Sequence, residues 1–189
     1  MDKPLALKLA PKSINDIIGQ RHLIGSGKIL TNLVKNKKIF SMILYGKPGI
    51  GKTSIANAIV NDLGVRYRFL NATINTKKDL DVVIEEAKMY DGIVLIMDEI
   101  HRLNKDKQDI LLPYLEDGSV FIIGATTSNP YIAINPAIRS RTHLLEVKPL
   151  SKEDVVIGLK RAISDKNGLK DYRLINEKLY SENYEKIIK

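Results

Sequence analysis

The sequence predicts an α/β fold in which a five-stranded parallel sheet carries helices on both faces. Two observations lead to this prediction. Short apolar runs of strand length alternate with segments whose apolar residues recur every three or four positions, as they do in amphipathic helices. This alternation is typical of a parallel sheet with helical crossovers. One run, residues 93–97, is apolar at every position, which is expected of a strand buried on both faces.

Length and composition limit the classes of function. The chain has 189 residues, 44% of them apolar and 28% charged, which is typical of a globular protein with a sizeable core. No run approaches the roughly 20 apolar residues that a membrane helix needs, and residues 1–10 lack the apolar stretch of a signal peptide. Cysteine is absent, which excludes disulfides and thiolate metal sites. We therefore expect a cytoplasmic protein.

The formal charge of +8 has two interpretations. Lysine and arginine displace counterions from phosphates, so a basic chain suits a nucleic-acid partner. The other interpretation is a general bias of composition toward lysine, because 22 of the 30 basic residues are lysine and only 8 are arginine. The charge alone leaves both open and indicates no binding face.

Five strands and three long helices are expected in the first 150 residues. The strands are 42–45, 65–70, 93–97, 120–125 and 143–147, and the helices are 52–63, 78–89 and 105–116. Gly64 follows the first of these helices and is expected to end it in the left-handed conformation. Pro113 stands inside the third, where it either kinks the axis or lies where a displaced carbonyl is tolerated.

The chain divides after residue 150. Ser151 and Asp154 have the pattern of a capping box, which opens a helix that we expect to run to about Asp165. A further helix is expected from about Asn176. Residues 151–189 are too few for a separate core. The sequence thus predicts a main domain, 1–150, and part of a small helical lid, 151–189.

A phosphate-binding loop follows the first expected strand. The segment 46–53, GKPGIGKT, fits the pattern G-x-x-x-x-G-K-[ST] in full and lies between a strand and a helix. Its glycines let successive N–H groups face one point, and the helix adds the positive end of its dipole. Lys52 is expected to reach the β- and γ-phosphates, and Thr53 to bind Mg²⁺. The residues of this segment and of the position after it that we expect to bind nucleotide are Gly46, Pro48, Gly49, Ile50, Gly51, Lys52, Thr53 and Ser54.

Two carboxylates end the third expected strand. Asp98 and Glu99 follow the apolar run 93–97, which places them at the carboxyl edge of a parallel sheet, where ligands bind in such folds. Asp98 suits Mg²⁺, directly or through water. Glu99 suits a general base that orients the attacking water. Together with the phosphate-binding loop, this pair predicts a site for ATP and Mg²⁺.

Two further segments add candidates. Residues 124–130, GATTSNP, end the fourth expected strand, where a hydroxyl could contact the γ-phosphate or its water. Thr127 is our choice and Thr126 the alternative. Arg139 and Arg141 precede the fifth strand, and an arginine there could stabilise γ-phosphate charge in a neighbouring subunit. Segment 124–130 also fits a polar strand end without a functional role, and the arginines also fit ordinary surface residues.

These motifs in this order resemble AAA+ ATPases of the clamp-loader group, a branch of the P-loop NTPases. Segment 11–20, PKSINDIIGQ, is similar to that group's adenine-side motif. Segments 98–118 and 123–130 resemble the replication-associated recombination protein A family, which is related to the Werner-helicase-interacting protein. The resemblance covers about residues 8–155, and 98–130 is its specific part.

The resemblance implies a function and partners. Members of the family are DNA-dependent ATPases of replication-fork maintenance, recombination and repair, and they act at stalled forks, gaps and duplex ends. They form tetramers through a C-terminal domain and work with single-strand DNA-binding protein. The expected cofactors are ATP and Mg²⁺, and the expected location is the bacterial cytoplasm, in association with the nucleoid.

The resemblance also assigns residues by position. The catalytic group is Glu99, Lys52, Thr127 as sensor 1 and Arg141 as arginine finger, and the metal ligands are Thr53 and Asp98. Ile17, Ile18 and Gly19 are expected near adenine. Asn71 lies where related ATPases place a polar residue that restrains the catalytic glutamate.

The sequence departs from the family pattern in places. Ala10 stands where arginine is usual, and Arg139 stands where leucine is usual, which makes Arg139 a second finger candidate. The 189 residues contain no Gly-Asp-x-Arg sensor 2 motif, and the tetramerisation domain is missing from them. Two alternatives remain. A Holliday-junction branch-migration motor shares Gly-Ala-Thr-Thr, although segment 128–130 favours the recombination family, and a nucleotide-binding module without turnover fits the short lid.

Overall fold

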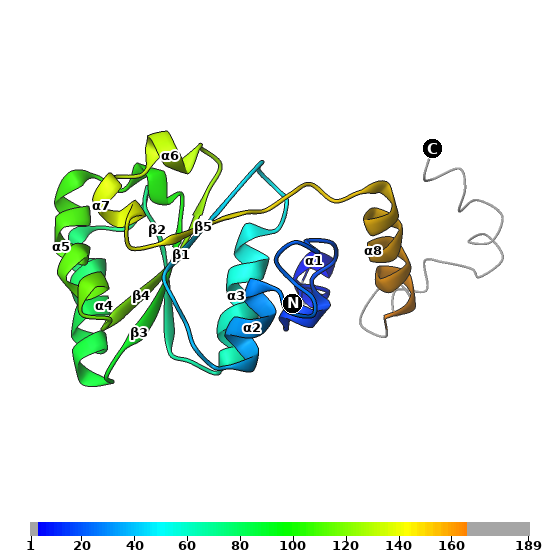
Figure 1. Cartoon of the computed structure of the whole chain (residues 1–189), viewed down its shortest axis with the longest axis horizontal. Helices are drawn as coiled ribbons and strands as arrows, with labels where there is room; N and C mark the ends of the chain where they lie inside the picture. Colours follow the sequence, from blue (N-terminus) through cyan, green and yellow to red (C-terminus); the bar gives the residue numbers. More distant parts are fainter. Residues whose placement is uncertain (1–3, 166–189) are drawn as a thin grey trace.

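A computed structural model of the chain describes residues 4–165, and it confirms the predicted fold class (Figure 1). The strands are β1 (Met42–Tyr45), β2 (Tyr67–Asn71), β3 (Ile93–Asp98), β4 (Val120–Thr126) and β5 (His143–Glu146). They form one sheet in the order β2-β3-β4-β1-β5, and every neighbouring pair is parallel. β1, the first strand in the chain, therefore lies inside the sheet.

Helices connect the strands. The longer ones are α2 (Ile29–Lys35), α3 (Lys52–Leu63), α4 (Lys77–Met89), α5 (Lys105–Glu116) and α8 (Lys152–Ser164). The short ones are α1 (Leu5–Lys8), α6 (Pro130–Ala133), α7 (Pro136–Arg139) and the 3₁₀ turns η1 (Ile14–Asp16) and η2 (Ile100–Arg102). Among the described residues, no helix is long and apolar enough to cross a membrane.

The sheet separates two apolar layers, as its strand patterns predict. Met42 and Leu44 of β1 pack with α2 and α3 on one face, whereas Ile43 packs with α4 and α5 on the other. Side chains alternate between the faces of a strand, so β1, apolar throughout, joins both layers. Figure 1 shows the same arrangement, with α2 and α3 on one side of the sheet and α4 and α5 on the other.

Most predicted bounds agree with the structure, and β2 is the main exception. The prediction 65–70 began two residues early, because β2 runs from Tyr67 to Asn71. β2 is an edge strand, and Tyr67 and Phe69 are exposed despite their apolar character. Gly64 ends α3 with φ +63°, as predicted. Pro113 lies inside α5 on its exposed side, where the carbonyl it displaces can meet water.

Helix α8 is fastened to the N-terminal segment. Ser151 and Asp154 form the predicted capping box, and Asp154 also accepts two hydrogen bonds from the guanidinium of Arg21, at 2.7 and 3.2 Å. Farther along the helix, Arg161 donates to the carbonyl of Asp16 at 2.5 Å. These contacts place the first lid helix against residues 16–21. The second helix, expected from about Asn176, lies outside the described residues.

Candidate nucleotide-binding site

Three predicted segments meet at the carboxyl edge of the sheet. The phosphate-binding loop follows β1, the acidic pair ends β3, and segment 124–130 ends β4. The register pairs Tyr45 of β1 with Thr126 of β4, and β4 also pairs with β3. Because all strands run in one direction, loops that follow neighbouring strands lie side by side. The fold therefore gathers the candidate residues as the sequence predicts.

The phosphate-binding loop has a backbone that requires glycine. Gly46, Gly49 and Gly51 adopt φ of +148°, +75° and +96°. A Cβ on Gly46 would lie 2.3 Å from the carbonyl oxygen of Val147, so this glycine also permits a close approach of two backbones. A Cβ on Gly49 or Gly51 would meet nothing within 4 Å. The loop is thus a cradle with open space beside Gly49 and Gly51.

Lys52 begins α3 and is buried, with 8% of its surface exposed. Its Nζ donates to the carbonyl oxygens of Gly46 and Lys47, at 2.9 and 2.8 Å. Burial lowers the pKa of this amine, and the negative charges of Glu99 and Asp98 act in the opposite direction. The ammonium group therefore lies within the loop and within electrostatic range of the acidic pair.

The other residues of the loop surround this amine. Pro48 and Gly49 are exposed, and Ile50 and Gly51 are half-buried. Thr53 and Ser54 are half-buried in the first turn of α3, beside the positive end of the helix dipole. The loop thus presents its backbone N–H groups and one hydroxyl-bearing turn to the same edge of the sheet.

The acidic pair ends β3 with an unusual turn. Asp98 is the last residue of the strand, and its Oδ1 accepts a hydrogen bond from the backbone N–H of Glu99 at 3.0 Å. Glu99 adopts the left-handed conformation, with φ 51° and ψ 39°. Such a conformation in a residue other than glycine costs free energy, and residues held in this way cluster at functional sites. The turn brings the Glu99 carboxylate back against His101, with 3.3 Å between Oε2 and Nδ1.

The two threonine candidates at the end of β4 lie in different environments. Thr126, the alternative, is buried, and its Oγ1 lies 2.9 Å from Nδ1 of His101 while it accepts from the N–H of Ser128 at 3.0 Å. Thr127 is exposed, one residue beyond the strand. The two hydroxyls therefore differ in position: one is fixed inside the turn, and the other faces out at the edge of the sheet.

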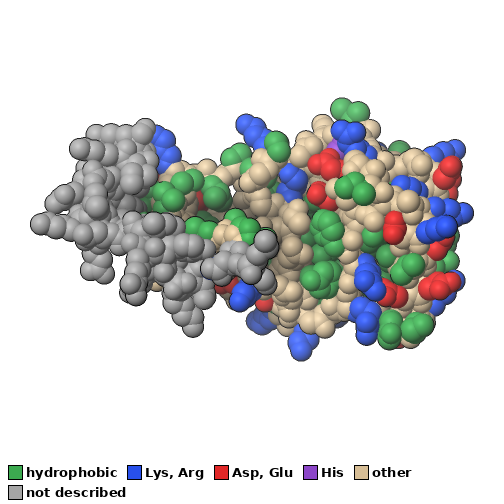
Figure 2. All heavy atoms as spheres, turned by 180° about the vertical axis from the view of Figure 1, so that it is seen from behind, with side chains coloured by type: hydrophobic (Ala, Val, Ile, Leu, Met, Phe, Trp, Pro, Cys, Tyr) green, Lys and Arg blue, Asp and Glu red, His purple; other side chains and the backbone are tan. Residues whose placement is uncertain are grey.

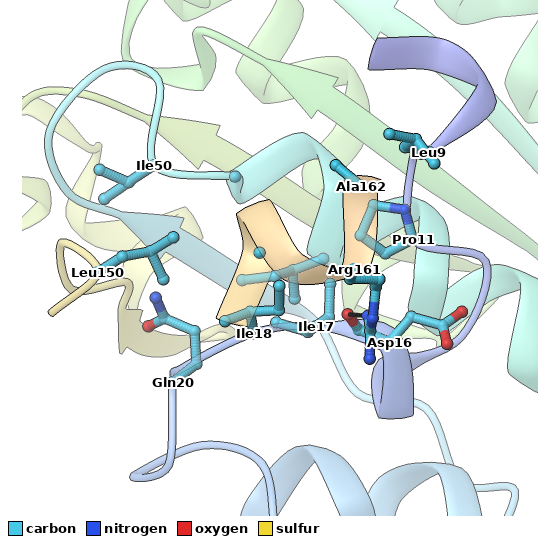
Figure 3. Close-up of a pocket in the computed structure, with 13 residues that line it drawn as sticks. Leu9, Pro11, Asp16, Ile17, Ile18, Gln20, Ile50, Leu150, Arg161 and Ala162 are labelled. Carbon is cyan, nitrogen blue, oxygen red and sulfur yellow. Dashed lines mark hydrogen bonds between the residues drawn. The ribbon is translucent and has the colours of Figure 1, made fainter. Parts of the chain in front are cut away.

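A mostly apolar pocket of about 240 Å³ adjoins the phosphate-binding loop. Ile17 and Ile18, which were expected near adenine, line it together with Ile50 of the loop (Figure 3). Gly19 is not among its lining residues. With φ +72°, Gly19 instead allows the chain to pass Leu150, because a Cβ there would lie 2.9 Å from Leu150 Cδ2. Gly19 therefore supports the pocket wall without forming it.

Sequence reasoning missed part of this pocket. Leu150 and the α8 residues Gly158, Arg161 and Ala162 also form its wall (Figure 3). Gln20 supports this wall, because its side chain exchanges hydrogen bonds with the backbone of Lys148 at 2.7 and 3.0 Å. The residues of α8 meet partners in this pocket that lie about a hundred residues or more away in the chain, so no local sequence pattern indicated the contact.

The two arginine candidates point to partners within the chain. Arg141 donates to the carbonyl of Ala137 at 2.7 Å and forms an ion pair with Glu116 at the end of α5. Arg139 donates to the carbonyl of Tyr131 in α6. The side chain of Arg141 is 34% exposed. Both arginines therefore lie on the surface near α5 and α6, outside the cradle.

The side chain of Asn71 is hydrogen-bonded within the turn that follows β2. It ends β2 opposite Asp98 in the register, as the predicted role requires. Its side-chain oxygen accepts hydrogen bonds from the N–H and the hydroxyl of Thr73, at 2.9 and 2.5 Å. The Glu99 carboxylate, in contrast, contacts His101. The structure thus places Asn71 beside the acidic pair with its oxygen turned to another partner.

The donor set fits ATP and Mg²⁺. Open space beside Gly49 and Gly51 leaves room for phosphate oxygens, and the neighbouring apolar pocket suits a planar base. The hydroxyl of Thr53 and the carboxylate of Asp98 are oxygen ligands of the kind that Mg²⁺ prefers. Residues 4–165 contain no group of three or more acidic, histidine or cysteine side chains that could hold a metal ion.

Comparison with known proteins agrees with this geometry. The family of Holliday junction DNA helicase RuvB P-loop domains matches residues 9–140. Replication-associated recombination protein A of Bacillus subtilis is 56% identical over 171 residues, which are 90% of this chain and 41% of that protein. The protein of the same name from Escherichia coli K12 is 38% identical, over 87% of this chain and 38% of its own length. The chain thus spans about two fifths of the length of these relatives.

A solved structure and a further relative are also similar to this chain. The Thermotoga maritima RuvB Holliday junction branch migration motor superposes with a TM-score of 0.71 and 28% identity, over 83% of this chain and 54% of that one. ATPase WRNIP1 of Dictyostelium discoideum is 36% identical over 91% of this chain and 20% of its own length. The chain therefore belongs to the family of RuvB-type P-loop domains of the AAA+ class, and it is similar in sequence to replication-associated recombination protein A.

Proposed function

We propose that the chain binds ATP with Mg²⁺ at the carboxyl edge of the sheet and hydrolyses ATP to ADP and phosphate. One observation carries the proposal. The glycine cradle at the start of α3 lies beside both the acidic pair that ends β3 and a mostly apolar pocket of about 240 Å³. Phosphate, metal and base are thus each provided for within one continuous site.

Each group of the site has a role in this proposal. The N–H groups of the cradle and the dipole of α3 bind the phosphates, and Lys52 contacts their outer oxygens. Thr53 and Asp98 hold Mg²⁺, which when bound neutralises charge on the β- and γ-phosphate oxygens. Glu99 accepts a proton from the attacking water. Thr127, exposed at the tip of β4, contacts the γ-phosphate or that water.

Binding requires Lys52 to change partners. Its Nζ donates to the carbonyls of Gly46 and Lys47, and the nucleotide offers charged acceptors in their place. Hydrogen bonds to charged acceptors are roughly twice as strong as those to neutral ones. Phosphate charge also favours the protonated amine, whose pKa burial lowers. The exchange of partners is therefore favourable once ATP is present.

We extend the proposal to the whole protein through its relatives. We infer a DNA-dependent ATPase of replication-fork maintenance, recombination and repair, which acts on forks, gaps and duplex ends as a tetramer with single-strand DNA-binding protein. The net charge of +8 suits a DNA partner. Figure 2 shows lysines and arginines interspersed with acidic residues on the face in view, so the DNA contact is not assigned to that face.

A branch-migration motor is the second candidate, and the solved RuvB structures favour it. Sequence identity decides between the two. The chain is 56% identical to the recombination protein of Bacillus subtilis and 28% identical to the RuvB motor. We therefore prefer the recombination-protein function.

The test of ATP hydrolysis is a Glu99→Gln variant compared with Glu85→Gln. Glu85 is an exposed residue of α4, so its substitution controls for the loss of one negative charge. We expect Glu99→Gln to bind a fluorescent ATP analogue as tightly as the unmodified chain and to lose turnover by at least about 100-fold. Glu85→Gln should keep both. Turnover that survives in Glu99→Gln would refute the role of Glu99. Binding of ATP without turnover in the unmodified chain would show that the chain is a nucleotide-binding module that does not hydrolyse ATP.

A further inference from the structure

His101 bridges two strands of the site through a single ring nitrogen. Its Nδ1 lies 3.3 Å from Oε2 of Glu99, just after β3, and 2.9 Å from Oγ1 of Thr126, at the end of β4. The imidazole is largely buried, with 16% of the side chain exposed. One side chain thus links the proposed base to the strand that carries the proposed sensor.

The backbone of η2 holds the imidazole in place. Ile100 and Leu103 flank His101 and are buried at 2% and 4% exposure, which anchors the turn in the core. Ile100 packs against Gly124 of β4, where a Cβ would lie only 2.8 Å from Ile100 Cδ1. The glycine therefore allows η2 to lie directly on β4, and the position of His101 is fixed by packing on both sides.

The neighbours of the imidazole indicate which ring nitrogen carries its hydrogen. An ionised Glu99 carboxylate has no hydrogen to donate, so a favourable contact with His101 requires the hydrogen on Nδ1. That N–H also faces Oγ1 of Thr126, and this oxygen accepts from the N–H of Ser128 as well. The contact with the carboxylate therefore favours the Nδ1–H form of the imidazole, whereas the contact with Thr126 fits either tautomer, because a hydroxyl can donate or accept.

We propose that His101 is a positioning residue for Glu99. It fixes Oε2 of the carboxylate against β4, so that Oε1 is the oxygen that accepts from the attacking water. The inference rests on the proposed hydrolysis of ATP and adds a residue to it. Asn71, which was expected to contact this glutamate, instead accepts hydrogen bonds from Thr73. In this chain the contact with Glu99 is made from η2.

The kinetic test compares His101→Ala with His101→Asn in the 189-residue chain. An asparagine amide can donate near the position of Nδ1, whereas alanine cannot. We expect His101→Ala to lower kcat about 10-fold or more, since it removes a hydrogen bond to a charged group, and to leave the affinity for ATP with Mg²⁺ within about 3-fold. His101→Asn should recover part of kcat. A role in folding alone would lower binding and kcat together.

The control is His143→Asn. His143 begins β5, an edge strand that pairs with β1, and contacts the ring of Phe40. We expect the His143→Asn substitution to leave kcat unchanged. A wild-type or raised kcat in His101→Ala, with Glu99→Gln inactive, would overturn the inference and spare the proposed function. Full activity in Glu99→Gln would instead overturn the proposed function.

A second measurement is independent of turnover and of how well the alanine variant folds. The chain has three histidines, so a long-range ¹H–¹⁵N spectrum of the imidazoles can be assigned by single substitutions. We expect His101 in the Nδ1–H form at neutral pH and a change in its Nδ1 resonance in Glu99→Gln. An Nε2–H form, or a resonance that ignores the substitution of Glu99, would overturn the inference even in a chain that does not hydrolyse ATP.

Discussion

At the scale of single residues, Glu99 combines a backbone cost with a chemical role. Its left-handed conformation, with φ 51°, is one that glycine adopts freely and other residues adopt at a cost of roughly 1–2 kcal/mol. The turn directs the carboxylate to His101, two positions later in the chain. The strained residue and the proposed base are therefore the same residue, which is the pattern expected where function and stability conflict.

This conflict predicts opposite effects of Glu99→Gly on stability and activity. We expect the variant to lose turnover and to gain about 1 kcal/mol in free energy of unfolding relative to Glu99→Ala, because both lack the carboxylate and only glycine relieves the backbone. Urea denaturation of the two variants measures the difference. Equal stability of the pair would show that the left-handed turn carries no strain.

At the scale of elements, β4 and η2 form one packed unit through Gly124 and Ile100. We expect Gly124→Ala to lower the free energy of unfolding by about 1–3 kcal/mol through overpacking, and to lower turnover by displacing His101. Adding Ile100→Val removes Cδ1, the atom nearest to the new methyl group. The double variant should therefore be more stable than Gly124→Ala alone. Additive effects of the two substitutions on denaturation would contradict direct contact.

The attachment of α8 depends on pH through Asp154. The hydrogen bond from Arg21 is the main cause that lowers the pKa of Asp154, and those from Ser151 act in the same direction. A carboxylate with a lowered folded-state pKa stabilises the attachment above its unfolded pKa of about 3.9, and this contribution is lost as the pH falls through the lower folded value.

We expect Asp154→Asn to loosen α8 at neutral pH and to differ little from the unmodified chain in strong acid. Hydrogen exchange of the α8 amides, corrected for the intrinsic rate at each pH, measures the attachment. Glu153→Gln is the matched control, because Glu153 is exposed and lies next to Asp154 in the same turn. Equal protection of α8 in Asp154→Asn and the unmodified chain at neutral pH would contradict the role of this carboxylate.

The sequence predicted the bounds of elements best where an apolar pattern begins and ends at residues that cap or break a helix or strand. β1, α3 and α5 have the predicted bounds, because each apolar pattern is bounded by a glycine, a cap or a turn. β2 was misplaced because its position at the sheet edge depends on strand order, which no local pattern encodes. The contact of His101 was also missed, since it depends on a single left-handed residue and on a partner 25 positions away in the chain.

At the scale of the whole molecule, the surface arginines predict shared active sites. Arg141 is paired with Glu116 on the surface of its own chain, outside the cradle, and we infer that it acts in the site of a neighbouring subunit. We expect specific activity to rise with protein concentration and to respond to forked DNA. Arg141→Ala should lower turnover of the assembled protein by roughly 10³-fold.

Glu116→Ala is the control for Arg141, because it removes the ion-pair partner and keeps the arginine. We expect this variant to keep most of its turnover. Specific activity that is independent of concentration, together with full turnover in Arg141→Ala, would show that each chain hydrolyses ATP alone.

The strand order has a consequence for folding. β1 is made first, yet Met42 pairs with Ile123 of β4 and His143 of β5, far along the chain. Contacts of such long sequence separation slow folding, and a partly synthesised chain lacks both neighbours of β1. The phosphate cradle after β1 therefore takes shape only when nearly all of the described chain has been made. A nucleotide that binds this cradle favours the folded state alone, and at 100 times its Kd it adds about 2.7 kcal/mol of stability.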